Sequence, residues 1–378
     1  MRRAVSYPHW GNPPWSIDSQ PARGNMPSEV DFAVVGGGFS GLSAAAWLRR
    51  FEPGKSVALF EAESIGAASS GHTGGMVLAE TAAGDLPGLG DVLAGFKAIL
   101  HDLAVHCDLH LPGVYEIGRS GGLHDSPISW SDSGSLRAMK QVPGGMVDPG
   151  KMLSGLARAA EKSGAQIFEN VCIDDIEFAA DPPILRFHGG NLRARKILLA
   201  TNAMSLELSE LALGGQPKFT LAVATEPLDA LQLESLGLSS ERPFYTIDFP
   251  YLWGRTLRTE GVVFGGGLVH VNDWRELTTL DARVGQSREL IEKLEARIRG
   301  LHPVLRTVRF TNEWGGPILI ANEWRPVFAQ HSRSPNAVVL GAFSGHGVAQ
   351  SVYLGKWAAE VLCGRKSLPQ WNRSLKSA

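Results

Sequence analysis

The sequence predicts an α/β protein with α+β character, and three observations support this. Near the start, a short apolar run at 30–35 leads through glycines into a helix of small residues, and a second apolar strand follows. Near the end, a strand at 337–341 precedes a glycine-rich turn and a final helix. Between about 217 and 314 strands dominate, broken by a helix near 279–299. We therefore expect a Rossmann-like unit with a parallel central sheet, and an inserted, mostly antiparallel β-sheet.

The remaining elements follow from hydrophobic periodicity and turn residues. Residues 1–28 are rich in Pro, Gly, Trp and Ser and show no period, so we expect an extended arm held down by Trp10 and Trp15. Residues 119–145 are expected to form loops. Further helices are expected at 40–50, 86–109, 149–162 and from 347 to about 362, and further strands at 56–60, 114–118, 165–168, 171–178, 184–187 and 192–199.

Composition limits the class of protein. At roughly 150 residues per domain, 378 residues suggest two domains. Hydrophobic residues make up 44% and charged residues 20%, which excludes a disordered or fibrous chain. The net charge of −2 gives no electrostatic reason to expect nucleic acid or an anionic membrane as a partner. The 44 glycines exceed the usual share of about 7% without any period, so we expect them where backbone approaches a ligand.

Cysteine usage and the N-terminus indicate a compartment. Cys107, Cys172 and Cys363 are too few and too far apart for a disulfide framework, which fits a reducing environment. The two arginines near the N-terminus have no apolar segment behind them, and no run of about 18 apolar residues occurs. We therefore expect a cytoplasmic protein without a membrane span.

The clearest motif is Gly36-x-Gly38-x-x-Gly41, which follows a strand and opens a helix. The first glycine permits a tight turn, the second lets the backbone approach a pyrophosphate, and the third lets the helix pack on the strand. Phe39 and Ser40 begin the helix, whose free N–H groups and partial positive charge favour phosphates. The motif predicts a dinucleotide site.

A carboxylate stands where the ribose of a dinucleotide is usually bound. Glu61 lies at the end of the second strand, 20 residues past Gly41, and can accept hydrogen bonds from the ribose hydroxyls. This acid favours an unphosphorylated adenosine ribose, so NADP is not expected. The motif and the acid together leave FAD and NAD open.

Four stretches resemble one superfamily of flavoproteins. Residues 64–76, SIGAASSGHTGGM, resemble the flavin-side loop of the D-amino-acid oxidase, glycine oxidase and sarcosine oxidase superfamily, and most closely its γ-glutamylputrescine oxidoreductase branch. Residues 198–203 resemble the strand end beside the adenosine, and 223–228 the opening strand of the substrate domain. Residues 341–348 resemble the turn and helix that hold the flavin pyrimidine ring. The resemblance implies an FAD-dependent amine oxidoreductase.

The resemblance spans about residues 28–365 and includes Trp314-Gly315-Gly316 and Glu323-x-x-Pro326, in which Glu replaces the family's Asp. It implies a discontinuous division of the chain. The expected parts are an arm at 1–28, an FAD-binding domain at 29–85, 146–215 and 315–365, a substrate-binding domain at 86–145 and 216–314, and a C-terminal tail at 366–378.

Non-covalent FAD is the cofactor that the resemblance implies. Flavin reduction puts negative charge at N1 and the pyrimidine oxygen, and the backbone N–H groups of Gly345–Val348 would supply donors there. Sarcosine oxidases attach flavin to a Cys ahead of this turn, but residues 318–347 contain none, which leaves His72 as the other candidate. The expected cofactor-binding residues are Gly36, Gly38, Phe39, Ser40, Gly41, Glu61, Ala62, Ser69, Ser70, His72, Thr73, Gly74, Gly75, Met76, Val171, Ala200, Thr201, Asn202, Gly316, Gly345, His346, Gly347, Val348 and Ala349.

Two departures from the family bear on the chemistry. His72-Thr73 stands where the branch commonly has Arg-Asn, so the role of that pair is not carried over. Sarcosine-oxidase relatives carry a lysine that assists oxygen reduction on the strand matching 261–267, whereas Val262-Val263-Phe264 here has none. The electron acceptor is therefore expected to be oxygen or another molecule, and an amine dehydrogenase is kept as an alternative.

The expected substrate is an amine or amino acid, oxidised to an imine by hydride transfer to flavin N5, with the imine then hydrolysed. Positioning carries such a reaction, so no catalytic triad is expected. Strand alternation puts Tyr251, Trp253 and Arg255 on one face, which in relatives faces the flavin. Arg255 can bind a substrate carboxylate while Trp253 forms a wall, or Arg255 is ion-paired at the surface. His72 and His346 can act as donor or base, or hold backbone only.

Other readings of the sequence are weaker. A flavoprotein scaffold or assembly factor without turnover is the competing function, and the net charge argues against a tRNA-modifying oxidase module. Glu226 is expected to be structural, because a carboxylate would repel a reduced flavin. Only His106 and His110 share a helical face beside Cys107, and no HExxH motif is present, so no metal site is expected.

Overall fold

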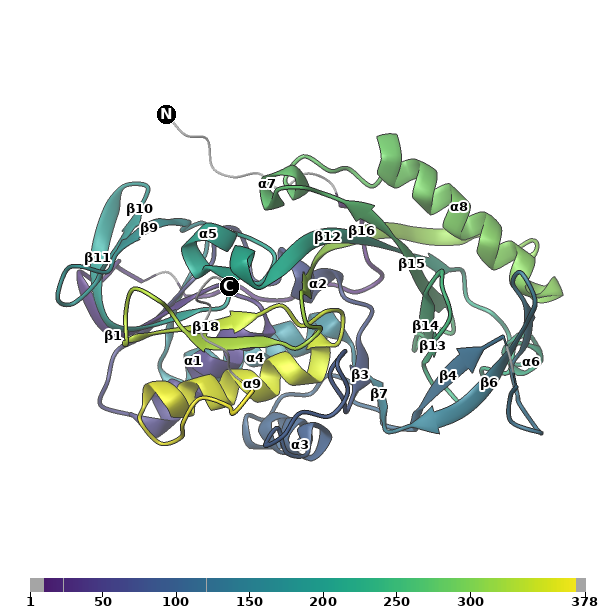
Figure 1. Cartoon of the computed structure of the whole chain (residues 1–378), viewed down its shortest axis with the longest axis horizontal. Helices are drawn as coiled ribbons and strands as arrows, with labels where there is room; N and C mark the ends of the chain where they lie inside the picture. The colour runs from purple at the N-terminus through teal and green to yellow at the C-terminus, as the bar shows by residue number, and fades with distance from the viewer. Residues whose placement is uncertain (1–9, 23, 120, 372–378) are drawn as a thin grey trace.

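The computed structural model describes residues 10–22, 24–119 and 121–371, and two large sheets organise them (Figure 1). The mainly parallel sheet lies in the left part of the view and the mainly antiparallel sheet in the right part. Residues 1–9 of the expected arm and 372–378 of the expected tail lie outside the described part. No helix among the described residues is both long and apolar enough to cross a membrane.

The mainly parallel sheet contains β1 (Glu29–Val35), β2 (Val57–Phe60), β8 (Gln166–Phe168), β9 (Ile173–Glu177), β10 (Ile184–Phe187), β11 (Gly190–Leu199), β17 (Val327–Gln330) and β18 (Ala337–Gly341). Its central order is β17-β18-β11-β1-β2-β8, with β10 and β9 added at β11. β1 pairs in parallel with both β2 and β11, and β11 with β18. The parallel core follows from strands that are apolar on both faces.

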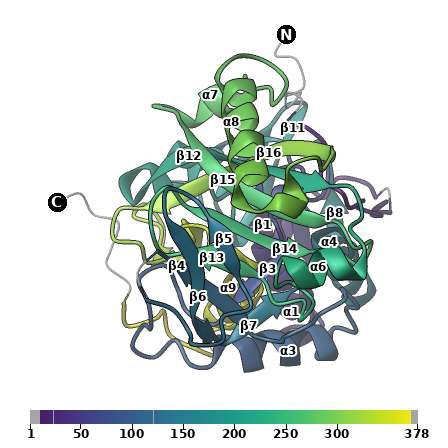
Figure 2. The ribbon, with the colours of Figure 1, turned by 90° about the vertical axis from the view of Figure 1, so that its right-hand side faces the viewer.

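The helices are α1 (Phe39–Phe51), α2 (Ser69–His72), α3 (Val92–Asp102), α4 (Pro149–Ser163), α5 (Leu206–Ser209), α6 (Ala230–Ser235), α7 (Trp274–Leu277), α8 (Gly285–Leu301) and α9 (Gly347–Leu362), with 3₁₀ turns η1 (Leu211–Leu213) and η2 (Pro303–Leu305). α1, α4 and α9 lie together against one face of the parallel sheet (Figure 1). α8 covers the outer face of the other sheet (Figure 2).

Small residues let α1 and α9 pack closely, although they come from opposite ends of the chain. A Cβ on Gly355 would stand only 2.5 Å from the Ser40 carbonyl oxygen, so the two helix backbones meet at this point. The Ser43 hydroxyl donates a 2.7 Å hydrogen bond to the Val352 carbonyl. This contact brings the C-terminal turn beside the N-terminal glycine motif.

The antiparallel sheet contains β4 (Val114–Gly118), β5 (Ser129–Ser131), β6 (Ser135–Val142), β12 (Gly215–Thr225), β13 (Phe244–Thr246), β14 (Leu252–Thr256), β15 (Val262–His270) and β16 (Phe310–Ala321), in the order β16-β12-β15-β14-β13-β4-β6-β5. Trp130, Phe244 and Phe264 pack on its outer face, with ring centroids 4.9–6.3 Å apart. The expected domain boundary near 315 falls inside β16.

Two expectations about residues 86–145 are wrong. Residues 119–145 do not form loops alone but contain β5, β6 and the start of β7 (Gly144–Met146), which pairs with β3 (Met76–Leu78). The sequence did not predict these strands because they are short and half polar. The helix expected over 86–109 is limited to α3, since Asp91 caps its start and the chain turns at Ala104, whose φ is +53°.

The described part of the N-terminal arm runs along both halves of the molecule. Trp10 is 2% exposed, and its indole N–H donates to the Leu277 carbonyl at 3.0 Å. Trp15 donates from its indole nitrogen to the Gly71 carbonyl at 2.8 Å. Both tryptophans hold the arm down, as expected from the sequence.

Candidate active site

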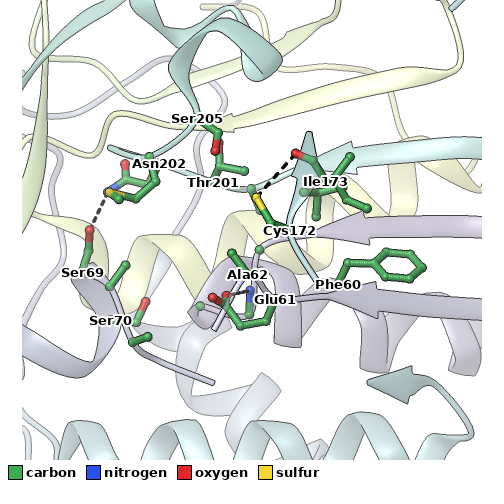
Figure 3. Close-up of a pocket in the computed structure, with 18 of the residues that line it drawn as sticks. Phe60, Glu61, Ala62, Ser69, Ser70, Cys172, Ile173, Thr201, Asn202 and Ser205 are labelled. Atoms are coloured by element: carbon green, nitrogen blue, oxygen red, sulfur yellow. Dashed lines mark hydrogen bonds between the residues drawn. The ribbon is translucent and has the colours of Figure 1, made fainter. Parts of the chain in front are cut away.

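A pocket opens at the carboxyl ends of β1, β2 and β11, where a parallel sheet usually receives its ligand. Figure 3 shows residues that line it. Ten expected cofactor-binding residues are among its lining: Gly36, Gly38, Glu61, Ala62, Ser69, Ser70, Val171, Ala200, Thr201 and Asn202. The pocket is also lined by ten residues that were not expected from the sequence: Val35, Gly37, Phe60, Gly66, Ala67, Ala68, Cys172, Ile173, Met204 and Ser205.

The three motif glycines differ in what surrounds them. Gly36 has a φ of +113°, and a Cβ there would lie 2.6 Å from the Ala200 carbonyl oxygen. A Cβ on Gly41 would lie 2.0 Å from the Gly36 carbonyl oxygen, so these two glycines make the turn itself possible. A Cβ on Gly38 would meet only the Ser70 hydroxyl, at 2.8 Å. Gly38 therefore leaves space in the pocket rather than shaping the turn.

Glu61 fastens the glycine turn to the end of β2. One carboxylate oxygen accepts from the Gly37 N–H at 2.7 Å, and the other from the Glu63 N–H at 3.1 Å. Burial raises the pKa of this carboxyl, and the two backbone donors oppose that rise. The carboxylate lines the pocket, where its remaining lone pairs can accept from a ribose.

The residues after β11 connect the loop at 64–76 to the C-terminal turn at 341–348 through hydrogen bonds. The Asn202 amide donates to the Ser69 hydroxyl at 3.1 Å (Figure 3), and its oxygen accepts from the Ala342 N–H at 3.0 Å. The neighbouring Thr201 hydroxyl is buried without a hydrogen-bond partner. A buried hydroxyl without a partner and a glycine-lined turn in the same pocket fit a polar dinucleotide.

Cys172 also lines the pocket, although it was not expected there from the sequence. It follows Val171, whose N–H donates to the Glu61 carbonyl at 2.9 Å, and precedes β9, so it lies on the same side of the pocket as Glu61 (Figure 3). Burial raises the pKa of its thiol to about 11, so the group is protonated at neutral pH. A protonated thiol beside the strand end is a packing group and a poor nucleophile.

His72, near the end of the loop at 64–76, is fixed by contacts with its own loop and with β16. The imidazole Nδ1 lies 2.9 Å from the Ala68 carbonyl, and the Trp314 indole donates to the His72 carbonyl at 3.0 Å. A Cβ on Gly316 would lie 2.6 Å from the His72 Cβ, so this glycine lets β16 approach the loop. Burial lowers the pKa of His72, which keeps the ring neutral at neutral pH.

Farther along the loop, Gly74 meets the antiparallel sheet. A Cβ on Gly74 would lie 2.1 Å from the Trp253 ring. The Arg255 guanidinium donates from Nε to the Gly74 carbonyl, and from Nη1 to the Thr256 carbonyl at 3.1 Å. Arg255 is 5% exposed, so the alternative of a surface ion pair is wrong. Burial lowers its pKa to about 10, which leaves the group charged at neutral pH.

The inner face of the antiparallel sheet carries one continuous row of paired residues. Strand register places two small residues, Gly265 and Ala222, between Trp253 and Trp314, and both small residues are buried. A Cβ on Gly265 would lie 2.0 Å from the Trp253 ring, so this indole packs directly on Gly265. From β6 to β16 the row is Lys140, Glu116, Tyr245, Trp253, Gly265, Ala222 and Trp314.

The C-terminal turn differs in detail from the expected row of free donors. The His346 N–H donates to the Phe343 carbonyl at 3.0 Å, so that donor is already used. The N–H groups of Gly347 and Val348 lie in the first turn of α9, where helix geometry leaves donors without a helical acceptor. Burial lowers the pKa of His346.

Other expected residues lie apart from this arrangement. Tyr251 precedes β14 and is 44% exposed, at the outer end of the face that carries Trp253. Glu226 pairs with Arg309, whose hydrogen bonds lower the pKa of the Glu226 carboxyl. Within the described ranges, no three His, Cys, Asp or Glu side chains stand together as a metal site would require.

Comparison with known proteins identifies the family. The model of the family described as FAD dependent oxidoreductase matches residues 31–361. The chain belongs to the FAD-dependent oxidoreductase family. Its cofactor is therefore FAD, and the resemblance and the α/β fold expected from the sequence are confirmed.

Individual relatives of this FAD-dependent oxidoreductase are distant but cover most of its length. It is 24% identical to a probable oxidoreductase, OrdL, of Rhizobium meliloti (strain 1021), over 96% of this chain and 90% of that protein. It is also 24% identical to γ-glutamylputrescine oxidoreductase of Escherichia coli (strain K12), over 88% and 84%. The crystal structure of glycine oxidase from Geobacillus kaustophilus matches with a TM-score of 0.73 at 17% identity, covering 93% of this chain and all of that one.

Proposed function

We propose that this flavoprotein oxidises an amine or amino acid that carries a carboxylate, at a CH–NH or CH–NH2 bond, to an imine. FAD, when bound, accepts the hydride from the carbon beside the nitrogen. The observation that carries the proposal is the buried guanidinium of Arg255. The guanidinium donates hydrogen bonds to two backbone carbonyls, and no carboxylate of the described residues lies within 4.0 Å of it.

A buried cation with no carboxylate in ion-pair contact is costly, because carbonyl dipoles replace only part of its hydration and the Asp148 carboxylate acts on Arg255 only from beyond 4.0 Å. The cost falls when an anion arrives. Arg255 is charged at neutral pH and contacts the loop that resembles the flavin-side loop of relatives. A substrate carboxylate would complete its coordination with paired N–H donors, which orients the substrate as well as binding it.

The neighbouring groups suit a substrate amine. Burial lowers the pKa of both His72 and His346, so neither ring adds a positive charge that would repel an ammonium group. A neutral imidazole can also accept the proton that an ammonium must lose before it is oxidised. Trp253 lies two residues before Arg255 on β14 and therefore on the same face of the sheet, which supports an apolar wall beside the carboxylate-binding group.

The experiment compares an amino acid with its decarboxylated analogue in anaerobic reduction of the bound flavin. We expect the carboxylate-bearing member to bleach the flavin absorption at much lower concentration. Arg255→Lys should weaken that member alone, by about ten- to a hundredfold, since Lys keeps the charge and loses the paired donors. Arg309→Lys is the matched control, because Arg309 pairs with Glu226 on the surface. Equal effects on both amines would contradict the carboxylate site.

The same experiment separates the competing functions. A flavoprotein scaffold would keep its FAD and show no bleaching with any amine of a broad panel. An oxidase and a dehydrogenase would both bleach and would differ on reoxidation. The absence of lysine on Val262-Val263-Phe264 favours an acceptor other than oxygen. Air-saturated buffer should then reoxidise the reduced protein more slowly than a soluble artificial acceptor does.

A further inference from the structure

Trp15 reaches the inner face of the antiparallel sheet from an arm that precedes the first strand. Its ring packs against Ala222, Ala224 and Val263, and meets Trp314 edge-on with centroids 5.4 Å apart. These small side chains leave room for an indole that no strand of the sheet supplies. The arm thus completes the face on which Trp253 and Arg255 lie.

The arm is fixed on both sides of Trp15. Before it, the Asn12 N–H donates to the Glu313 carbonyl at 3.2 Å, and the Gly315 N–H donates to the Trp10 carbonyl at 2.7 Å, so the arm extends the edge of β16. After it, the Asp18 N–H donates to the Ser154 hydroxyl of α4 at 2.8 Å. Residue 15 is therefore held at a defined place between the two halves of the molecule.

Trp15 contacts both the Arg255 guanidinium and the loop that accepts its hydrogen bond. Its indole N–H donates to the Gly71 carbonyl at 2.8 Å, in the loop whose Gly74 carbonyl accepts from Arg255. The Arg255 guanidinium carbon lies 5.7 Å from the centre of the Trp15 ring, within cation–π range. One side chain thus fixes both the loop and the guanidinium that binds it.

The chemical nature of the groups that hold Arg255 decides whether its charge can bind an anion. A carboxylate that held Arg255 would cancel its charge and compete with an anionic ligand. An aromatic face and carbonyl oxygens hold a guanidinium through dipole and quadrupole interactions and leave its full charge in place. Arg255 is held mainly in the second way, because its hydrogen bonds go to carbonyl oxygens and the Asp148 carboxylate acts on its charge only from beyond ion-pair distance.

We propose that Trp15 is a positioning residue for Arg255, so that the N-terminal arm forms part of the substrate site. The inference rests on the proposed role of Arg255 as the carboxylate-binding group. It sets the plane of the guanidinium and the position of the Gly71 to Gly74 loop.

The test measures binding of benzoate, with benzamide as its uncharged match, through the change in the absorption spectrum of the bound flavin. Trp15→Leu should weaken benzoate binding about tenfold and leave benzamide unchanged. Trp15→Phe keeps an aromatic face and should lose only about two- to threefold, and it carries the test if the Leu variant does not fold. Trp130→Phe is the control, because it removes a buried indole N–H bond, to the Leu236 carbonyl, on the other face of the same sheet.

A double-mutant cycle with Arg255→Lys separates the two proposals. If Trp15 acts through Arg255, then Trp15→Leu should cost less than about twofold in the Arg255→Lys background. Benzoate binding that falls with Arg255→Lys but not with either Trp15 variant overturns the positioning role and leaves the proposed function intact. Benzoate binding that is unchanged in Arg255→Lys overturns both. An equal loss of benzoate and benzamide in the Trp15 variants would mean that Trp15 only supports the fold.

Discussion

The two large sheets place their functional residues in different ways. In the parallel sheet, each of three pocket-lining groups follows its own strand within a few residues: Gly36 follows β1, Glu61 follows β2 and Asn202 follows β11. In the antiparallel sheet, the inner face is assembled by register across seven strands, and its last wall comes from Trp15 in the arm. The first site is local in sequence and the second is not.

This difference predicts how the two regions respond to mutation. A change in the parallel sheet should affect FAD binding and folding together, because the glycine turn that lines the pocket also connects strand to helix. A change on the inner face of the antiparallel sheet should alter substrate binding and leave FAD in place. The predictions below test that separation.

The largest effect is expected at Gly36, in the first turn. Gly36→Val should abolish FAD binding and destabilise even the apoprotein by roughly 3 kcal/mol or more, because φ of +113° is strained for any side chain and the Cβ would meet the Ala200 carbonyl. Flavin content and urea unfolding of the apoprotein measure the two effects.

Gly38→Val sharpens the result, because the space around Gly38 faces the pocket. This variant should also lose FAD, while its apoprotein unfolds close to the wild type, since only the movable Ser70 hydroxyl opposes the new side chain. The holoprotein should then differ from the wild type mainly by the stabilisation that bound FAD contributes. A Gly38→Val protein with stoichiometric FAD would show that the pyrophosphate lies elsewhere.

What the sequence predicted follows the same division. The glycine motif, Glu61 and the strand ends were predictable because spacing along the chain fixes their positions in a βαβ unit. The row from Lys140 to Trp314 was not, because pairing between distant strands depends on bulges and register that periodicity does not reveal. Arg255 was predictable as a candidate from strand alternation and the family resemblance, whereas its burial and its contact with Trp15 depend on the folded arm.

A smaller effect is expected in the antiparallel sheet at Gly265. Gly265→Ala should retain stoichiometric FAD, cost about 1–3 kcal/mol in unfolding free energy, and slow substrate-driven flavin reduction by about tenfold or more. The reason is that a Cβ would displace the Trp253 ring, which packs on Gly265 and lies on the same face of the sheet as Arg255. Gly267→Ala is not a matched control, because Gly267 has a φ of +79°.

Gly300 provides the better control, since nothing lies within 4 Å of a Cβ there and its φ is not positive. Gly300→Ala should leave both reduction and FAD content unchanged. Loss of FAD in Gly265→Ala would contradict the separation between the two regions, because it would tie the inner face to cofactor binding.

The smallest expected effect is a pH dependence of stability, and it comes from His72 and His346, which lie between the two sheets. Burial lowers the pKa of His72 and of His346 below the ordinary value of 6.5. Below about pH 6.5 the unfolded chain therefore binds protons that the native protein does not, and stability falls as pH falls. Each histidine can account for up to about 1.4 kcal/mol between pH 7.5 and 5.5. Glu61 acts in the opposite direction, because burial raises its pKa above that of the unfolded state.

Variants isolate the histidine contribution from that of Glu61. His346→Gln should lose less unfolding free energy than the wild type between pH 7.5 and 5.5, measured by urea unfolding with saturating FAD, and His72→Gln should behave alike. Glu61→Gln should show the reverse, a steeper loss on acidification, because it removes a group whose native form binds its proton more readily. Each histidine lies beside a hydrogen bond to β16. The Trp314 indole donates to the His72 carbonyl, and the Ser344 N–H, two residues before His346, donates to the Leu319 carbonyl. If neither histidine variant changes the pH dependence, the two rings are solvated in the native protein, and the junction between the sheets is more open than their contacts with Trp10, Trp314 and Ser344 imply.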